Sequence, residues 1–181
     1  MRLRAIVIMA AVLVALGALY AIASRPRLVP QPEPRPIVWS VEMQELAAIA
    51  ISLPRQAKSE TWAKRDDGYW YFDGAGGPKV DMNRWGGGIP LILSGPAAER
   101  HITAEPTAEQ LESYGLASPR MVIRLTLKDD RTIDVAVGDD TPNGQACYLR
   151  LTGSGDVYTV HRSWYEVLER LVLEPPYPKA E

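Results

Sequence analysis

The sequence predicts an α+β protein: an N-terminal transmembrane helix, a proline-rich stalk, and one domain of mostly antiparallel sheet with two or three packed helices. Three observations carry this prediction: a run of 20 residues without a charged side chain, several short segments that alternate apolar with polar residues, and two segments that begin like capped helices. The expected parts are a cytoplasmic leader at 1–4, a transmembrane anchor at 5–24, the stalk at 25–36, an extracytoplasmic domain at 37–174 and a tail at 175–181.

The composition limits the class of protein. A chain of 181 residues has room for one ordinary domain and an appendage, and 46% hydrophobic with 23% charged residues excludes wholesale disorder. The 20 Lys and Arg residues are balanced by 22 Asp and Glu residues, so no nucleic-acid partner is expected, because that role needs a basic excess. The single cysteine, Cys147, excludes an internal disulfide and any site that needs several cysteines.

The uncharged run at 5–24 has the length of a membrane span. At 1.5 Å per residue, a helix of this length reaches about 30 Å, the thickness of the bilayer core. Arg2 and Arg4 precede the run, and the first acidic residue is Glu33. This pattern is typical of a signal anchor, which predicts a single-pass protein of the cytoplasmic membrane, in contact with the bilayer through residues 5–24, with its domain on the extracytoplasmic side.

Two alternatives stay open for this segment. Residues 21–23 resemble the small-residue cleavage site of a signal peptide, although the apolar part of such peptides is usually only about 7–15 residues long. Arg25 and Arg27 follow the span, so the opposite topology is the second alternative. Ala10, Gly17 and Ala21 lie near one helical face, where small residues let membrane helices approach closely, or they are ordinary constituents of a membrane helix.

The stalk contains alternating prolines. Five prolines in 26–36 favour polyproline II, and these 11 residues would reach roughly 34 Å at about 3.1 Å each. We interpret the segment as a spacer, with a ligand for a proline-binding module as the alternative.

The strands are predicted by period-two alternation. Residues 46–53 begin like a helix and then alternate, residues 60–65 and 69–72 flank a turn at Asp66-Asp67-Gly68, and residues 123–127 and 132–137 form the clearest hairpin. Two further strands are expected at 147–151 and 157–160. One apolar face per strand predicts a sheet with one packed side.

Capping boxes predict two helices. Thr107 with Gln110 begins the first, which Gly115 ends, and Ser163 with Glu166 begins the second. The second helix is expected to pack through one apolar face: Trp164, Val167, Leu168, Leu171 and Val172. Between 81 and 94, Gly86-Gly87-Gly88 and Pro90 break a helical pattern, which predicts a short helical turn, a kink and a second short piece. Trp85 beside these glycines either packs in the core or contacts a partner together with Gly86, Gly87 and Gly88.

No catalytic, cofactor or metal site is predicted. Asp129-Asp130 and Asp139-Asp140 fit turn chemistry better than a calcium loop, which needs several oxygens at set intervals. His101 and His161 are expected at the surface or at a cap, and Cys147 is expected to be a buried, inert thiol.

Five motifs, taken together, resemble the bacterial domain of unknown function 4340 family. They are Gly68-Tyr69-Trp70, residues 114–119 (YGLASP), residues 137–144 (VGDDTPNG), residues 148–150 and residues 157–160. The resemblance covers roughly residues 46–173. It implies an N-terminal anchor, an extracytoplasmic α+β domain and a setting beside membrane transport components, and it carries over no site residues. Many members repeat the unit, whereas this chain has room for one, and the glycine run interrupts a stretch that is usually a continuous helix.

These features predict a non-catalytic, single-pass accessory subunit of a bacterial cytoplasmic membrane, which presents its periplasmic domain to a transport, respiratory or photosynthetic complex of other membrane subunits. The alternative is an extracytoplasmic module that binds a cell-wall fragment or a small solute through the aromatic surface near Trp85. An enzyme is the third and least supported hypothesis.

Overall fold

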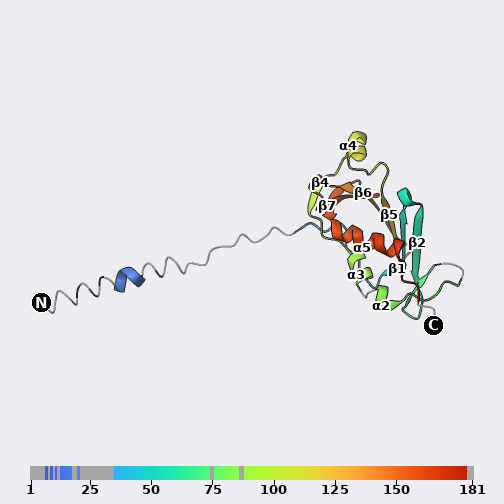
Figure 1. The fold of residues 1–181 in the computed structure, drawn as a ribbon, viewed down its shortest axis with the longest axis horizontal. Helices are drawn as coiled ribbons and strands as arrows, with labels where there is room; N and C mark the ends of the chain where they lie inside the picture. The colour runs from blue at the N-terminus through green and yellow to red at the C-terminus, as the bar shows by residue number, and fades with distance from the viewer. Residues whose placement is uncertain are drawn as a thin grey trace. The chain divides into compact units, whose positions relative to one another are not determined.

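The computed structural model describes residues 35–73, 76–85 and 88–178, together with residues 7, 9, 11, 13–17 and 20 (Figure 1). The chain divides into two units, 1–34 and 35–181. In the first unit the described residues are helical, and no helix in the described part of the chain is both long enough and apolar enough to cross a membrane. The predicted leader, most of the anchor and nearly all of the stalk lie outside the described residues.

The second unit is built on one eight-stranded sheet in which all neighbours are antiparallel, in the order β3-β2-β1-β5-β6-β7-β8-β4. This confirms the α+β class and the mostly antiparallel sheet. The strands are β1 (Leu46–Leu53), β2 (Lys58–Lys64), β3 (Trp70–Phe72), β4 (Arg100–Thr103), β5 (Met121–Leu127), β6 (Thr132–Asp140), β7 (Ala146–Leu151) and β8 (Val157–His161).

The predicted hairpins are confirmed. In the β5–β6 hairpin Ile123 pairs with Val135, and alternate residues of β5 are buried, as the period of two requires. In the β2–β3 hairpin the turn residue Gly68 has a φ of 80°, which a residue without Cβ adopts at no steric cost. The helix-like beginning predicted for residues 46–53 is wrong, because this segment is a strand throughout and pairs with both β2 and β5.

Four α-helices and one short 3₁₀ helix complete the unit: η1 (Pro54–Gln56), α2 (Met82–Trp85), α3 (Ile89–Leu93), α4 (Ala108–Ser113) and α5 (Arg162–Leu173). The two short helices α2 and α3 confirm the predicted break between two helical pieces. The capping box of α4 is also confirmed, because the side chains of Thr107 and Gln110 each accept a main-chain N–H of the other.

Helix α5 packs on the sheet against β1, β2, β7 and β8 (Figure 1). The predicted capping box at Ser163 is wrong: β8 runs directly into the helix, and His161 is the N-cap, with its Nδ1 accepting the N–H of Ser163 at 3.2 Å. The buried face also differs from the predicted one. Tyr165 is buried in place of Val167, which is 43% exposed, while Leu168, Leu171 and Val172 are buried as predicted.

Tryptophans fill the core beneath α2. Trp85 is 1% exposed, and its ring centroid lies 5.2 Å from that of Trp62 and 5.7 Å from that of Trp70. Both contacts are within the range of favourable aromatic pairs. Trp85 therefore packs in the core, and its ring is not part of an exposed aromatic surface as the alternative interpretation required.

Candidate functional site

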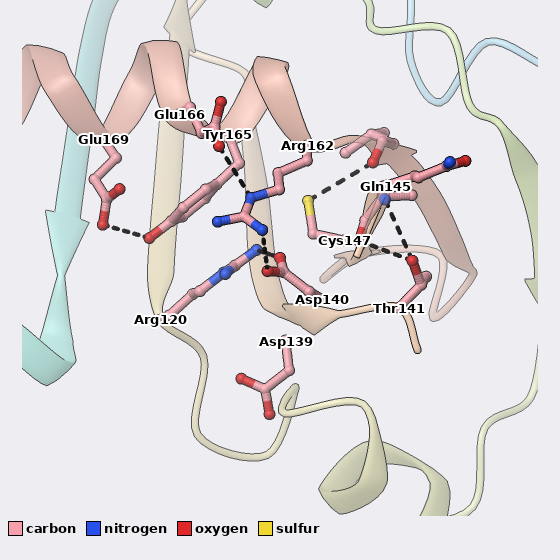
Figure 2. Close-up of polar contacts among 12 residues, drawn as sticks. Arg120, Asp139, Asp140, Thr141, Gln145, Cys147, Arg162, Tyr165, Glu166 and Glu169 are labelled. Carbon is pink, nitrogen blue, oxygen red and sulfur yellow. Dashed lines mark hydrogen bonds and ion pairs between the residues drawn. The ribbon is translucent and has the colours of Figure 1, made fainter. Parts of the chain in front are cut away.

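A cluster of charged side chains lies where α5 begins (Figure 2). Asp140 at the end of β6 accepts a hydrogen bond from Arg120 at 2.5 Å and lies 3.3 Å from the Arg162 guanidinium. Arg162 also donates to Glu166, one turn further along the helix, at 2.9 Å. Asp140 therefore joins the end of β6 both to the segment before β5 and to the first turn of α5.

The cluster extends along α5 through Tyr165. The Arg120 guanidinium lies 3.7 Å from the centre of the Tyr165 ring, and the Tyr165 hydroxyl donates to Glu169 at 2.6 Å. Burial, and then the hydrogen bond to Glu169, raise the pKa of Tyr165, so the phenol stays protonated at neutral pH. A protonated phenol that already donates its proton is a packing and anchoring group.

Cys147 lies behind this cluster. Its side chain is fully buried and its Sγ is 3.8 Å from the carbonyl oxygen of Val160, to which it donates. Burial raises the pKa of the thiol to about 11. Because the thiolate is the nucleophilic form, this confirms the predicted buried cysteine and gives it the character of an inert thiol.

Asp139 points away from the arginines, since consecutive residues of a strand face opposite sides (Figure 2). Its carboxylate lies 2.7 Å from Arg55, and its N–H donates to the carbonyl oxygen of Tyr114 at 2.8 Å. The neighbouring Gly138 has no room for a side chain, because a Cβ there would lie 2.1 Å from the same carbonyl oxygen. The end of α4 is therefore seated directly on β6.

The turn after β6 is closed by its own polar side chains. Thr141 Oγ1 accepts the N–H of Ala146 at 3.2 Å, and Asn143 Oδ1 accepts the N–H of Gln145 at 3.1 Å. Gly144 has a φ of 69°, which favours glycine. The turn is thus held by Thr141 and Asn143, whereas Asp139 and Asp140, for which turn chemistry was predicted, lie in β6 and pair with arginines.

The two histidines lie apart. His101 on β4 is exposed and lies 3.0 Å from Asp156, and this hydrogen bond is the main cause of a lowered pKa for the Asp156 carboxyl. His161 caps α5. Within the described ranges, no group of three or more His, Cys, Asp or Glu side chains is placed to hold a metal ion.

Comparison with known protein families decides the classification. Residues 93–170 match the model of the domain of unknown function 4340. This segment belongs to the domain of unknown function 4340 family. No curated protein and no solved structure matches the chain. The match begins at residue 93 and so leaves out the Gly68-Tyr69-Trp70 motif, which the sequence resemblance had included.

Two of the segments that carried the resemblance to the domain of unknown function 4340 meet one another in the fold. The segment 114–116 packs on residues 138–139: Gly115 has a φ of 68° and faces the Asp139 carboxylate, while Leu116 lies against Gly138. Asp140, in the segment 137–144, holds α5 through the arginine cluster. In the structure, these segments form turns and contacts between elements. From the sequence alone, they could be identified only by the order of their residues.

The residues predicted for a partner interface are distributed over both units. Gly17 lies in the helical part of the first unit, Trp85 is buried at the end of α2, and Gly88 precedes α3. Ala10, Ala21, Gly86 and Gly87 lie outside the described residues.

The surface around α2 and α3 is apolar, although Trp85 itself is covered. Four large apolar side chains are more than a third exposed there: Met43 (42%), Met82 (39%), Leu91 (64%) and Val167 (43%). Two grooves of about 170 and 370 Å³ open on this surface, and Trp85 lines both of them. We call these four residues and the two grooves the α2–α3 surface.

Proposed function

We propose that this chain is a non-catalytic, single-pass membrane accessory subunit, which presents its extracytoplasmic domain to a larger transport, respiratory or photosynthetic complex. The α2–α3 surface is the observation that carries the proposal. Apolar side chains scattered singly over a surface need no explanation, but a group of them beside grooves is typical of a protein–protein contact. The uncharged run at 5–24 and the prolines after it supply the anchor and the spacer of this proposal.

The charges beside this surface indicate the chemistry of the partner. Arg84 and Arg170 line the larger groove together with Glu174. Arg84 donates only to main-chain oxygens, at 3.3 and 3.4 Å, and neither arginine forms an ion pair with another described residue. We therefore infer a partner subunit that presents apolar side chains with acidic ones beside them, because such a surface would complement both the apolar residues and the arginines.

The test is co-migration in native membranes. After mild detergent solubilisation, the wild-type chain should migrate on a native gel within a large, discrete complex. Leu91→Glu places a charge at the most exposed apolar residue of the α2–α3 surface and should release the chain from the complex. Ala108→Glu is the matched control, because Ala108 is an exposed residue on α4 at the opposite end of the domain (Figure 1). Migration of the wild-type chain near its own mass would contradict the proposal.

The membrane part of the proposal has its own test. Gly17→Leu combined with Ala21→Leu enlarges the small-residue face of the helix at 5–24 and should weaken co-purification with the complex. Unchanged co-purification of this double variant would remove helix–helix contact from the proposal and leave the α2–α3 surface as the only contact.

A further inference from the structure

A groove with both polar and apolar lining residues, separate from the α2–α3 surface, opens beside the edge strand β4. It has a volume of about 570 Å³, within the usual range for small-ligand sites. Its floor crosses three strands, because Thr159 on β8 pairs with Tyr148 on β7 and with Arg100 on β4. The loop after β6 supplies Asn143 and Gln145 to its wall. The tertiary fold therefore forms the groove from three separate stretches of the chain, 99–102, 141–148 and 159–161.

The floor of this groove carries the hydroxyl of Thr159. Thr159 is only 3% exposed and is the one polar side chain counted in the buried core of the described residues. Its hydroxyl lines the groove and forms no hydrogen bond to another residue that the structure describes. Because Thr159 lines the groove and its hydroxyl has no partner in the described part of the chain, this hydroxyl is available to a bound molecule.

Beside the apolar Ile102, Pro142 and Ala146, the groove contains several hydrogen-bond donors. Arg100 has no ion pair among the described residues, and the side-chain amides of Gln145 and Asn143 keep their N–H groups free within the same part of the chain. The Nδ1 of His161 accepts the N–H of Ser163, which leaves the proton of the neutral ring on Nε2. The acid of the groove, Glu99, is occupied by Arg35 at 2.8 Å.

We propose that this groove binds a sugar acid, a small ligand that combines one carboxylate with several hydroxyl groups. One free guanidinium selects a single carboxylate, since arginine and a carboxylate form strong paired hydrogen bonds. The amides, the imidazole N–H and the Thr159 hydroxyl match the oxygen-rich remainder of such a molecule. Neutral sugars would leave Arg100 unpaired, and simple anions would leave the other donors unused.

The experiment is isothermal titration of the full-length purified chain with four probes. D-glucuronate should bind, while D-glucose, acetate and inorganic phosphate should each bind at least tenfold more weakly. Arg100→Gln should weaken glucuronate binding about tenfold or more, and Thr159→Val, which keeps the side-chain shape, should weaken it about threefold to tenfold. The control Arg131→Gln replaces an exposed arginine in the turn between β5 and β6 and should leave binding unchanged.

Three results would overturn the proposal. Glucuronate that gives no binding heat rules out a sugar-acid site. Acetate or phosphate that binds as tightly as glucuronate would make the groove a general anion site. Wild-type affinity in both Arg100→Gln and Thr159→Val would place the ligand elsewhere. Near-UV circular dichroism of Thr159→Val distinguishes loss of the site from loss of the fold, and none of these results depends on the membrane complex.

Discussion

Replacement of Trp85 by alanine tests whether this residue belongs to the core or to an interface. The side chain is 1% exposed and lies between the rings of Trp62 and Trp70. A buried aromatic side chain removes roughly 150–250 Å² from water, worth about 4–6 kcal/mol at about 25 cal/mol per Å². Because alanine retains part of this burial, we expect Trp85→Ala to lower the free energy of unfolding by about 3–5 kcal/mol.

The assay is urea unfolding of the full chain, followed by far-UV circular dichroism. With a slope of about 2 kcal/mol per M, the unfolding midpoint should fall by about 2 M. Leu91→Ala is the matched control, because Leu91 is 64% exposed and its loss should change stability by less than about 0.5 kcal/mol. An unchanged midpoint for Trp85→Ala would refute the core assignment and return Trp85 to the surface.

A second variant at the same position separates the contribution of the buried indole ring from that of its N–H group. Trp85 Nε1 is buried and has no hydrogen-bond partner among the described residues. Trp85→Phe leaves a small cavity but removes this unsatisfied N–H, whose burial is unfavourable by about 1–3 kcal/mol. We therefore expect Trp85→Phe to destabilise the domain by less than half as much as Trp85→Ala. If both variants lower the free energy of unfolding by the same amount, the indole N–H of Trp85 is hydrogen-bonded in solution.

Three further predictions concern the contacts around β6. Gly138→Ala should destabilise by about 2–4 kcal/mol in urea unfolding, since its Cβ would collide with the Tyr114 carbonyl oxygen, whereas Gly153→Ala, with open space around it, should be neutral within about 0.5 kcal/mol. Arg120→Met should lower the free energy of unfolding by about 1–3 kcal/mol, because it removes a partly buried partner of Asp140, while Arg131→Met, at an exposed pair, should leave the urea midpoint almost unchanged. Because burial raises its pKa to about 11, Cys147 should stay protonated and unreactive toward a thiol reagent at pH 8 until guanidinium unfolds the chain; rapid labelling of the native chain would contradict this.

The sheet was predictable because its signals are local. Alternating residues in β5 and β6, the turn at Gly68 and the capping box of α4 are each complete within a few residues, and tertiary contacts did not override them. Strand order was not predictable in the same way. β4 adds to the far edge beside β8, and no pattern within residues 100–103 specifies that partner.

The two wrong predictions have physical reasons in the tertiary structure. In residues 46–53 the run of alanines resembles a helix, but β1 lies in the interior of the sheet between β2 and β5, where small residues are accommodated between neighbouring strands. The sequence predicted that α5 begins with a capping box at Ser163, but in the structure β8 continues directly into the helix. His161 provides the cap instead, because its pairing with Ala146 fixes the chain just before the helix.

The candidate groove shows why function was harder to predict than fold. Its floor joins Arg100, Tyr148 and Thr159, which become neighbours only through antiparallel pairing of β4, β8 and β7. In the sequence, Thr159 is an ordinary strand threonine and Arg100 an ordinary surface arginine. The conspicuous residues, the paired aspartates of 139–140, are instead used to seat α4 and α5 on the sheet. The residues that carried the family resemblance therefore belong to the scaffold of this domain, and ligand chemistry has to be sought among side chains that the scaffold brings together.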